Sequence, residues 1–162
     1  MDTVKDFNTK VVDIAKDLDA DPAHLLAVMN FETGGTLDSK FKNKAGSGAT
    51  GLIQFMPATA KELTKADSKA AAIKILEDMT PTEQLDYVKK YLEPFKGKLN
   101  TLDDVYMAVL YPKAVGKDSD YALFEKGTKA YWQNRGLDIN EDGIVTKAEA
   151  ASKVRKYGQV EA

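Results

Sequence analysis

The sequence predicts one mainly helical domain with little sheet. Its 162 residues, of which 43% are hydrophobic, can build one sizeable core and are too few for two comfortable ones. Apolar residues recur at three- and four-residue intervals, the period of an amphipathic helix, and good capping residues precede several of these segments. No repeat, low-complexity tract or linker interrupts the pattern, so we treat residues 1–162 as a single domain.

Two helices are expected at the N-terminal end, over residues 4–18 and 22–32. In the second helix, Asp21 is suited to the N-cap and Pro22 to the first turn, and the glycine pair at 34–35 would end it. The first helix presents one apolar stripe to the core: Val4, Phe7, Val11, Ile14, Ala15 and Leu18.

The middle of the chain alternates loops and helices. Residues 36–50 are rich in Gly, Ser, Asn and Lys and predict a loop, with short extended pieces around 52–55. Two capping boxes are expected at helix starts: Thr80 with Glu83, and Thr101 with Asp104. The later helices are expected over residues 57–65, 84–92, 105–111, 121–136 and 147–158. Residues 112–120 break the helical pattern.

Composition excludes several classes of protein. The chain has no cysteine, which excludes a disulfide framework, a thiol nucleophile and a cysteine-based zinc site. A net charge of -2 and a pI near 5.5 argue against a nucleic-acid partner, because such surfaces carry a strong basic excess. Residues 1–20 carry charges every few positions, so we expect a soluble protein with no signal peptide and no membrane insertion.

The segment "DINEDGIVTKAE", residues 138–149, matches the calcium loop of an EF-hand. The expected ligands are Asp138, Asn140, Asp142, Ile144 through its carbonyl oxygen, Thr146 and Glu149. Gly143 permits the sharp turn at the sixth position of the loop. Helices that end near Arg135 and begin near Lys147 would complete the frame.

The Ca²⁺ cofactor is expected to be structural. The chain contains one such loop, whereas calcium sensors normally open a groove between paired loops. Val145, at the eighth position, could pair the loop with a neighbouring strand. The alternative interpretation is an acidic, solvated turn that contains an Asp-Gly pair.

Glu32 ends a largely apolar segment, "LLAVMNFE", with Val28 and Met29 one turn back. Partial burial among such neighbours would raise the pKa of the carboxyl group and favour the protonated form, which is the environment of a general acid. The alternative is a solvated, inert glutamate. The following loop returns as "GLIQ", in which Gln54 offers an amide that can read hydroxyl and N-acetyl groups.

The stretch "FETGGTLDSKFKNKAGSGATGLIQFMPATA" resembles the pattern of soluble lytic transglycosylases, the family 23 glycoside hydrolases that also include goose-type lysozymes. The first motif of that family is Glu-Ser-Gly-Gly, and the second is Gly-Leu-Met-Gln followed by a Met-Pro-x-Thr-Ala stretch. The resemblance is nearest to phage-encoded members, and some relatives also carry an EF-hand. It implies a lysozyme-like fold of the α+β lysozyme superfamily with the EF-hand at its C-terminal end.

The resemblance implies a role for each matched position. Glu32 matches the catalytic glutamate, which protonates the glycosidic oxygen between N-acetylmuramic acid and N-acetylglucosamine. The residues implied to contact substrate are Thr33, Gly51, Leu52, Gln54 and Tyr111. Ile53 replaces the methionine of the second motif.

The third family motif, Ala-Tyr-Asn-x-Gly, is matched in part by "AVLYPKAVG". Tyr111 keeps the tyrosine and is a candidate to hydrogen-bond Glu32 or the substrate. Pro112 stands at the asparagine position, and the glycine comes late, at Gly116.

The reaction implied by the resemblance is substrate-assisted. One glutamate acts first as acid and then as base, and the product carries a 1,6-anhydromuramic end without consuming water. A goose-type lysozyme would admit water instead, and the acid motif does not separate the two outcomes. A mechanism with two carboxylates would need a partner for Glu32, for which Asp38 and Asp86 are arithmetic candidates.

Two further classes of function stay open. One is a calcium-dependent binding or regulatory module in which Glu32 is inert, and the other is a structural virion protein that keeps the fold without activity. As an enzyme, the protein would act on peptidoglycan glycan strands, as a monomer or as a domain of a phage virion protein. It would work from the virion, or in the host periplasm and cell wall after delivery, either as an endolysin or as a virion-associated lysin.

Other chemistry-bearing residues have simpler interpretations. His24 has no partner motif and is expected at the surface or at a helix cap. Tyr131 and Trp132 could stack on a sugar ring, but their position before the calcium loop favours core packing. A small cluster of lysines could meet carboxylates of the cell wall or form a solvated face: Lys40, Lys42 and Lys44.

Overall fold

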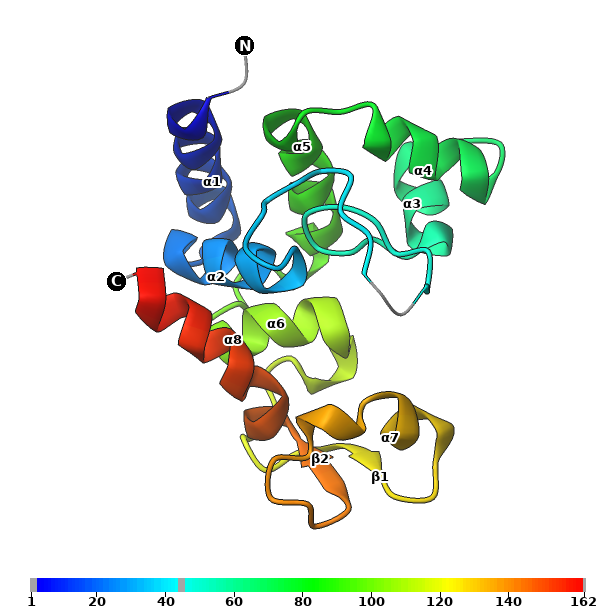
Figure 1. The fold of residues 1–162 in the computed structure, drawn as a ribbon. Helices are drawn as coiled ribbons and strands as arrows, with labels where there is room; N and C mark the ends of the chain where they lie inside the picture. Colours follow the sequence, from blue (N-terminus) through cyan, green and yellow to red (C-terminus); the bar gives the residue numbers. More distant parts are fainter. Residues whose placement is uncertain (1–2, 44–45, 162) are drawn as a thin grey trace.

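The computed structural model describes residues 3–43 and 46–161, and the mainly helical prediction is confirmed (Figure 1). The first part of the chain forms α1 (Val4–Leu18), α2 (Pro22–Glu32), α3 (Pro57–Thr64), α4 (Lys69–Glu77), α5 (Pro81–Leu92) and the short 3₁₀ turn η1 (Glu93–Phe95). α1 packs against α2 and α5, and α3 packs against α4 and α5. The helix α4 has no counterpart among the predicted elements.

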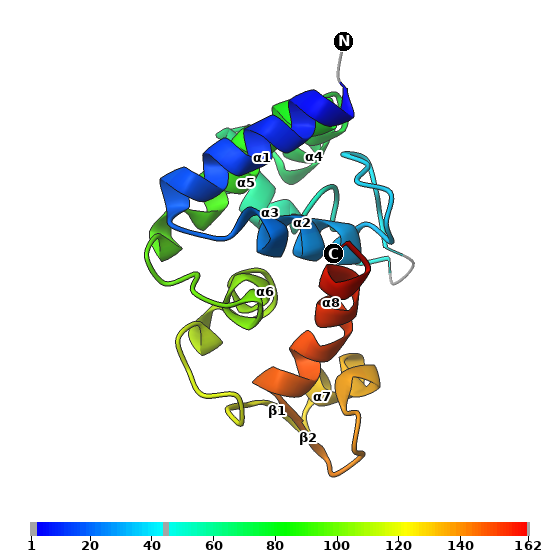
Figure 2. The same ribbon diagram turned by 90° about the vertical axis from the view of Figure 1, so that its left-hand side faces the viewer.

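The second part of the chain packs below α2. It contains α6 (Leu102–Leu110), η2 (Pro112–Ala114), β1 (Ala122–Glu125), α7 (Lys129–Gln133), η3 (Arg135–Leu137), β2 (Ile144–Thr146) and α8 (Lys147–Glu161). Both α6 and α8 contact α2 and each other, so α2 lies between the two parts of the chain (Figures 1 and 2). This central helix carries Glu32 at its last position.

The local signals at the helix ends act largely as predicted. Asp21 caps α2 by accepting the N–H of Ala23, and Thr80 with Glu83 forms the complete capping box of α5. Thr101 caps α6, but the side chain of Asp104 does not return the second bond of a capping box. The Asp104 carboxylate instead pairs with Lys147, as described below. The prediction of a complete capping box at Thr101 is therefore wrong.

One continuous helix over residues 121–136 is also a wrong prediction. The first residues form β1, which pairs antiparallel with β2, with Phe124 opposite Val145. Gly127, at φ +100°, then turns the chain into the short helix α7. The pairing that was predicted for Val145 is confirmed. The helix prediction is wrong because a local sequence pattern does not show that its first residues have a partner strand about twenty residues further along the chain.

The core consists mainly of the predicted apolar faces. Phe7, Val11, Ile14 and Leu18 of α1 are buried, but Val4 is 78% exposed because it lies at the first position of the helix, beyond the elements that cover the stripe. Residues 50–55 form a tight turn closed by a bridge between Thr50 and Phe55, instead of extended pieces. No helix in the described part of the chain is long and apolar enough to cross a membrane.

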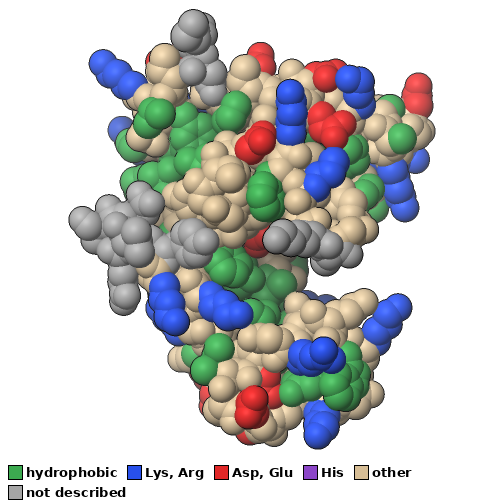
Figure 3. All heavy atoms as spheres, in the orientation of Figure 1, with side chains coloured by type: hydrophobic (Ala, Val, Ile, Leu, Met, Phe, Trp, Pro, Cys, Tyr) green, Lys and Arg blue, Asp and Glu red, His purple; other side chains and the backbone are tan. Residues whose placement is uncertain are grey.

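A cleft opens on one side of the molecule. In Figure 3 the surface is hollowed between the part that contains α2 to α5 and the part that contains β1 and α7, and hydrophobic side chains line its back. Figures 1 and 3 share one orientation, in which the C-terminal ends of α2 and α6 are directed toward this hollow. We use the word cleft for this hollow below.

Candidate active site

Glu32 occupies the last turn of α2, where the helix meets α6 and the loop that follows it. The residue is partly buried, while Val28 and Met29 one turn back are fully enclosed in the core. Phe31 packs its ring edge-on to Tyr106 of α6, with centroids 5.6 Å apart. The surroundings of the carboxyl group are therefore apolar and are provided by α2 and α6.

Burial raises the pKa of the Glu32 carboxyl group from 4.5 to about 7. The cause is desolvation, because apolar surroundings solvate a carboxylate less well than water does. No charged neighbour and no hydrogen bond from the described residues contributes to the shift. Glu32 can thus carry its proton near neutral pH, as a general acid must.

Tyr106 is a neighbour of Glu32 that the sequence analysis did not place in the site. Its ring is buried, and burial together with the charge of Glu32 raises the pKa of its hydroxyl group. The motif tyrosine, Tyr111, lies at the C-terminal cap of α6 and packs edge-on against Phe124 of β1, with ring centroids 5.6 Å apart. Tyr106 therefore borders the carboxyl group, and Tyr111 joins α6 to the lower part of the molecule.

Thr33 fixes the end of the helix that carries Glu32. Its side chain is fully buried, its hydroxyl donates to the carbonyl of Met29 at 2.8 Å, and the same oxygen accepts the N–H of Leu37 at 2.9 Å. Gly34 and Gly35 follow at φ +59° and +87°, which end α2 as predicted. In this geometry the Thr33 hydroxyl braces the helix end and does not face the cleft.

A buried glutamine that the sequence analysis missed holds the second motif. Gln84 of α5 accepts the N–H of Leu52 at 2.8 Å and donates to the carbonyls of Ser39 and Leu76 at 2.9 and 3.1 Å. Gly51 has φ +86°, and a Cβ there would collide with Oε1 of Gln84. Glycine is thus required at this position by both the backbone angle and the lack of space.

The side chain of Gln54 also stabilises the turn of residues 50–55. The backbone of Gln54 is in the left-handed region at φ +55°, and its side-chain amide donates to the carbonyls of Phe41 and Gly51, both at 2.9 Å. Its Oε1 atom is buried and has no hydrogen-bond partner among the described residues. A small cavity of about 40 Å³ lies beside it: Ile53, Gln54, Phe55, Met56, Thr59, Tyr91 and Val109 line its wall.

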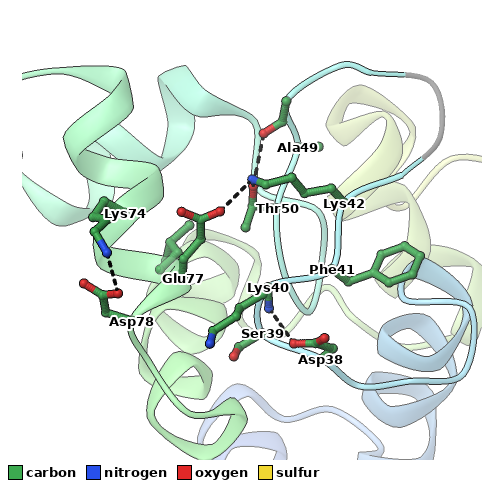
Figure 4. A network of polar contacts seen from close by, with 12 residues as sticks. Asp38, Ser39, Lys40, Phe41, Lys42, Ala49, Thr50, Lys74, Glu77 and Asp78 are labelled. Atoms are coloured by element: carbon green, nitrogen blue, oxygen red, sulfur yellow. Dashed lines mark hydrogen bonds and ion pairs between the residues drawn. The ribbon is translucent and has the colours of Figure 1, made fainter.

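The loop between the two motifs is fastened to α4 (Figure 4). The Lys42 ammonium donates to the Thr50 hydroxyl at 2.7 Å and pairs with Glu77 at 3.1 Å. The predicted lysine cluster is thereby divided: Lys42 stabilises the loop, Lys40 lies exposed nearby, and Lys44 lies outside the described residues.

Neither arithmetic partner for Glu32 is arranged as a second catalytic carboxylate. Asp38 is exposed and accepts the backbone N–H of Lys40. Asp86 pairs with Lys10, at 2.9 Å, on the contact between α5 and α1. The absence of any charged contribution to the pKa of Glu32 agrees with this placement.

The acidic side chains of the 138–149 segment converge below α8. One carboxylate oxygen from each of Asp138, Asp142 and Glu149 lies within 4.8 Å of the others. The two oxygens of Glu149 accept the N–H groups of Asn140 and Thr146, at 3.2 and 3.1 Å, so the first turn of α8 bends back over the loop. Ile144 belongs to β2, with its side chain outward.

Asp138 is the most enclosed of these acids. Its Oδ2 atom accepts the hydroxyl of Tyr131 at 2.5 Å and the N–H of Gly143 at 3.0 Å, and the bond from Tyr131 lowers the pKa of the Asp138 carboxyl group. Its Oδ1 atom is buried without a hydrogen-bond partner among the described residues. An unpartnered anionic oxygen amid other oxygen donors fits a hard cation such as Ca²⁺.

A wide groove whose lining does not include Glu32 lies elsewhere on the molecule. It has a volume of about 1150 Å³ and runs between the start of α6, the 116–120 loop and the start of α8. On its wall, the buried side chains of Asp104 and Lys147 pair at 2.5 Å, and Asp104 also accepts the N–H of Gly116 at 2.8 Å. The buried polar groups on this wall are already paired with one another, so we assign the groove no ligand. His24 is partly buried near the start of α2, outside the site.

A mainly helical domain with a partly buried glutamic acid that keeps its proton near neutral pH is consistent with a lysozyme-like enzyme. The family model described as the transglycosylase SLT domain matches residues 13–119, more than half of the chain. The chain therefore belongs to the transglycosylase SLT family, whose members cleave peptidoglycan. Comparisons with curated proteins and with solved structures found no match.

Proposed function

We propose that this protein is a peptidoglycan lytic transglycosylase that breaks the β-1,4 bond between N-acetylmuramic acid and N-acetylglucosamine, with Glu32 as its general acid and base. The observation that carries the proposal is the partly buried Glu32 carboxyl group, whose pKa of about 7 arises from burial alone. The family match supports the substrate class.

The reaction uses Glu32 twice. The protonated carboxyl group donates its proton to the glycosidic oxygen as the bond to C1 breaks, and the N-acetyl group of the substrate stabilises the cationic centre. The resulting carboxylate then accepts the proton of the muramic 6-hydroxyl while that oxygen bonds to C1. No charged neighbour among the described residues contributes to the pKa of Glu32, which supports a route in which this one carboxyl group serves as both acid and base, without a separate carboxylate nucleophile.

The other substrate contacts remain part of the proposal. Gly51 and Leu52 are buried in their turn and would support the glycan site from within, whereas Gln54 is partly exposed and would meet the glycan directly. Thr33 supports the reaction by holding Glu32, and Tyr111 by joining α6 to β1. The alternative product is that of a hydrolytic muramidase, in which water replaces the 6-hydroxyl on the same scaffold.

We also propose that residues 138–149 form an EF-hand that binds a structural Ca²⁺ ion. Its ligands would be Asp138, Asn140, Asp142, the carbonyl of Ile144, Thr146 and Glu149. The convergence of the three carboxylates and the unpartnered Oδ1 atom of Asp138 support the site. The ion would supply positive charge that holds these acids together, and thereby the start of α8 against α2 and α6.

For the biological setting we propose phage entry or host lysis, with a monomer or a virion-protein domain acting on the host cell wall. The support is the resemblance of residues 31–60 to phage-encoded transglycosylases. Peptide mass spectrometry of purified virions separates the two roles, because a virion-associated lysin is found in the particle and an endolysin is not.

The test of Glu32 compares the clearing of purified peptidoglycan by wild type and by Glu32→Gln. The amide keeps the shape of the side chain and cannot donate the proton, so activity should fall by roughly a thousandfold or more. Asp38→Asn is the matched control, since it removes an exposed carboxylate and should keep full activity. Clearing by Glu32→Gln would reject the enzyme proposal and leave a binding module or a structural virion protein.

A further inference from the structure

Trp132 departs from its expected place in the core. It is 52% exposed on α7, whereas its neighbour Tyr131 is buried as predicted and donates a hydrogen bond to Asp138. A half-exposed indole is unusual, because tryptophan normally buries most of its large apolar surface. Trp132 is also the only tryptophan in the chain.

The indole ring is held in place by its neighbours. The edge-to-face partner Tyr131 has its ring centroid 5.9 Å away, and the guanidinium carbon of Arg135 lies 5.5 Å from the indole centroid. Tyr131 is itself fixed by its hydrogen bond to Asp138. The Arg135 guanidinium thus lies over the indole ring, and the rest of the ring surface is apolar and half-exposed.

In sequence, the segment before the acidic 138–149 loop carries an excess of basic side chains, while Asp138 of that loop is bonded to Tyr131, the neighbour of Trp132. Between residues 111 and 137 the chain has five basic and three acidic side chains: Lys113, Lys117, Lys126, Lys129 and Arg135, against Asp118, Asp120 and Glu125. Within the described residues, none of these five cations belongs to an ion pair. Figure 3 shows basic side chains around hydrophobic ones on this lower part, below the cleft.

A chain of contacts links α7 to the end of α6. The edge-on contact of Tyr111 with Phe124 joins the end of α6 to β1, and α7 packs on β1. Figure 1 shows α7 on the side of the molecule toward which the ends of α2 and α6 are directed. Residues 120–162, which include α7, lie outside the part of the chain that matches the family model.

We propose that Trp132 and Arg135 form a second glycan-binding surface, on which a sugar ring of the peptidoglycan strand stacks at a distance from the bond that Glu32 cleaves. The apolar face of a pyranose ring fits an exposed indole, and the lactyl or stem-peptide carboxylate of a muramic residue fits the cations Arg135 and Lys129. The inference rests on the proposed function, because it takes its ligand from that reaction.

The first experiment uses Trp132 as its own reporter. The Glu32→Gln protein, in constant excess calcium chloride, is titrated with soluble glycan strands freed of stem peptides, and tryptophan emission and acrylamide quenching are recorded. We expect a saturable blue shift and roughly twofold or greater protection from quenching, because a stacked sugar shields the indole from water. Binding of the strands by calorimetry with unchanged emission and quenching would overturn the inference.

The second experiment compares variants in the wild-type background on the same strands. Trp132→Ala should raise KM roughly two- to tenfold with kcat unchanged, and Trp132→Tyr should restore most of the loss. Val12→Ala is the matched control, because Val12 is 51% exposed on α1 and lies outside the cleft. Melting temperatures with calcium chloride show whether Trp132→Ala keeps the fold, and Trp132→Tyr tests the inference if it does not.

The outcomes separate this inference from the proposed function. An unchanged KM for Trp132→Ala would overturn the glycan surface while cleavage by the wild type leaves the enzyme intact. If Trp132 instead mediates self-association, sedimentation would show a concentration-dependent dimer that Trp132→Ala removes, with no response to glycan, and the inference would also fall. Loss of the enzyme proposal itself would appear as absence of any Glu32-dependent product.

Discussion

At the C-terminal end of α2, the properties of Glu32 follow from its surroundings. The surroundings of its carboxyl group are apolar, and no described group donates a hydrogen bond to the carboxylate. Thr33 and the two following glycines fix the end of the helix. The ionised form is consequently disfavoured, and the proton is held up to about pH 7. A buried carboxyl group of this kind is suited to acid catalysis, but it lowers the stability of the folded protein when it ionises.

This unfavourable burial predicts a pH-dependent effect of Glu32→Gln on stability. The folded-state pKa of about 7 lies above the value of 4.5, so the stabilising contribution of the proton is complete below pH 4.5 and is lost as pH rises through 7. We expect Glu32→Gln to be more stable than wild type by about 1–3 kcal/mol at about pH 8, and equally stable near pH 4. Thermal melting across this range measures the difference, and a constant difference at all pH values would contradict the burial argument.

At the scale of elements, the loop of the second motif is held by one buried side chain. Gln84 binds backbone groups from three segments, and Gly51 is the residue whose missing Cβ makes room for it. The loop is thus positioned from α5, which is remote from it in sequence, while Lys42 ties it to α4.

Gly51→Ala should therefore destabilise the protein by about 2–4 kcal/mol, since it adds a clash to an unfavourable backbone angle. Gly97→Ala is the matched control: Gly97 has φ +82°, and an added Cβ there would have no neighbouring atom within 4 Å, so only the backbone cost of about 1–2 kcal/mol applies. Urea denaturation compares the two variants. Equal losses would show that Gln84 yields to the new methyl group.

The contact between α6 and α8 depends on a buried ion pair. Lys147→Met leaves Asp104 buried without its cation and should cost about 3–5 kcal/mol. The double variant Asp104→Leu with Lys147→Met removes both charges and should recover a large part of that loss, although the N–H of Gly116 then lacks its acceptor. Denaturation of both single variants and the double completes the cycle. Strictly additive losses would mean that the two side chains do not interact.

At the scale of the whole molecule, α8 connects the loop at 138–149 to the helix that carries Glu32. Its first turn contains Glu149, and its body packs on α2 and α6. An ion bound only by the folded protein would therefore stabilise this contact and the lower part of the cleft by mass action.

Removal of Ca²⁺ by a chelator should lower the melting temperature by ~5–10 °C. Glu149→Gln should melt at the lower temperature with or without calcium, because it weakens the ligand that closes the loop. Asp118→Asn, which removes an exposed acid outside the loop, should keep the full response. A wild-type melting temperature that is the same with and without calcium would contradict the proposed ion.

The sequence predicts what neighbouring residues determine. The start of α2 follows from Asp21 and Pro22, and the partly buried place of Glu32 follows from the apolar run before it. Contacts between distant segments are not predictable in this way: β1 requires Val145 of β2, and Gln84 serves three separate segments. The exposure of Trp132 likewise depends on how α7 packs on β1, which no local pattern encodes.

The most direct test of the central claim is mass spectrometry of the muropeptides that wild type and Glu32→Gln release from purified peptidoglycan. The proposed mechanism predicts products with 1,6-anhydromuramic ends, one water lighter than hydrolytic products, from the wild type and none from Glu32→Gln. Reducing muramic ends would identify a hydrolytic muramidase and contradict the attack by the 6-hydroxyl. The same products from both proteins would contradict the role of Glu32.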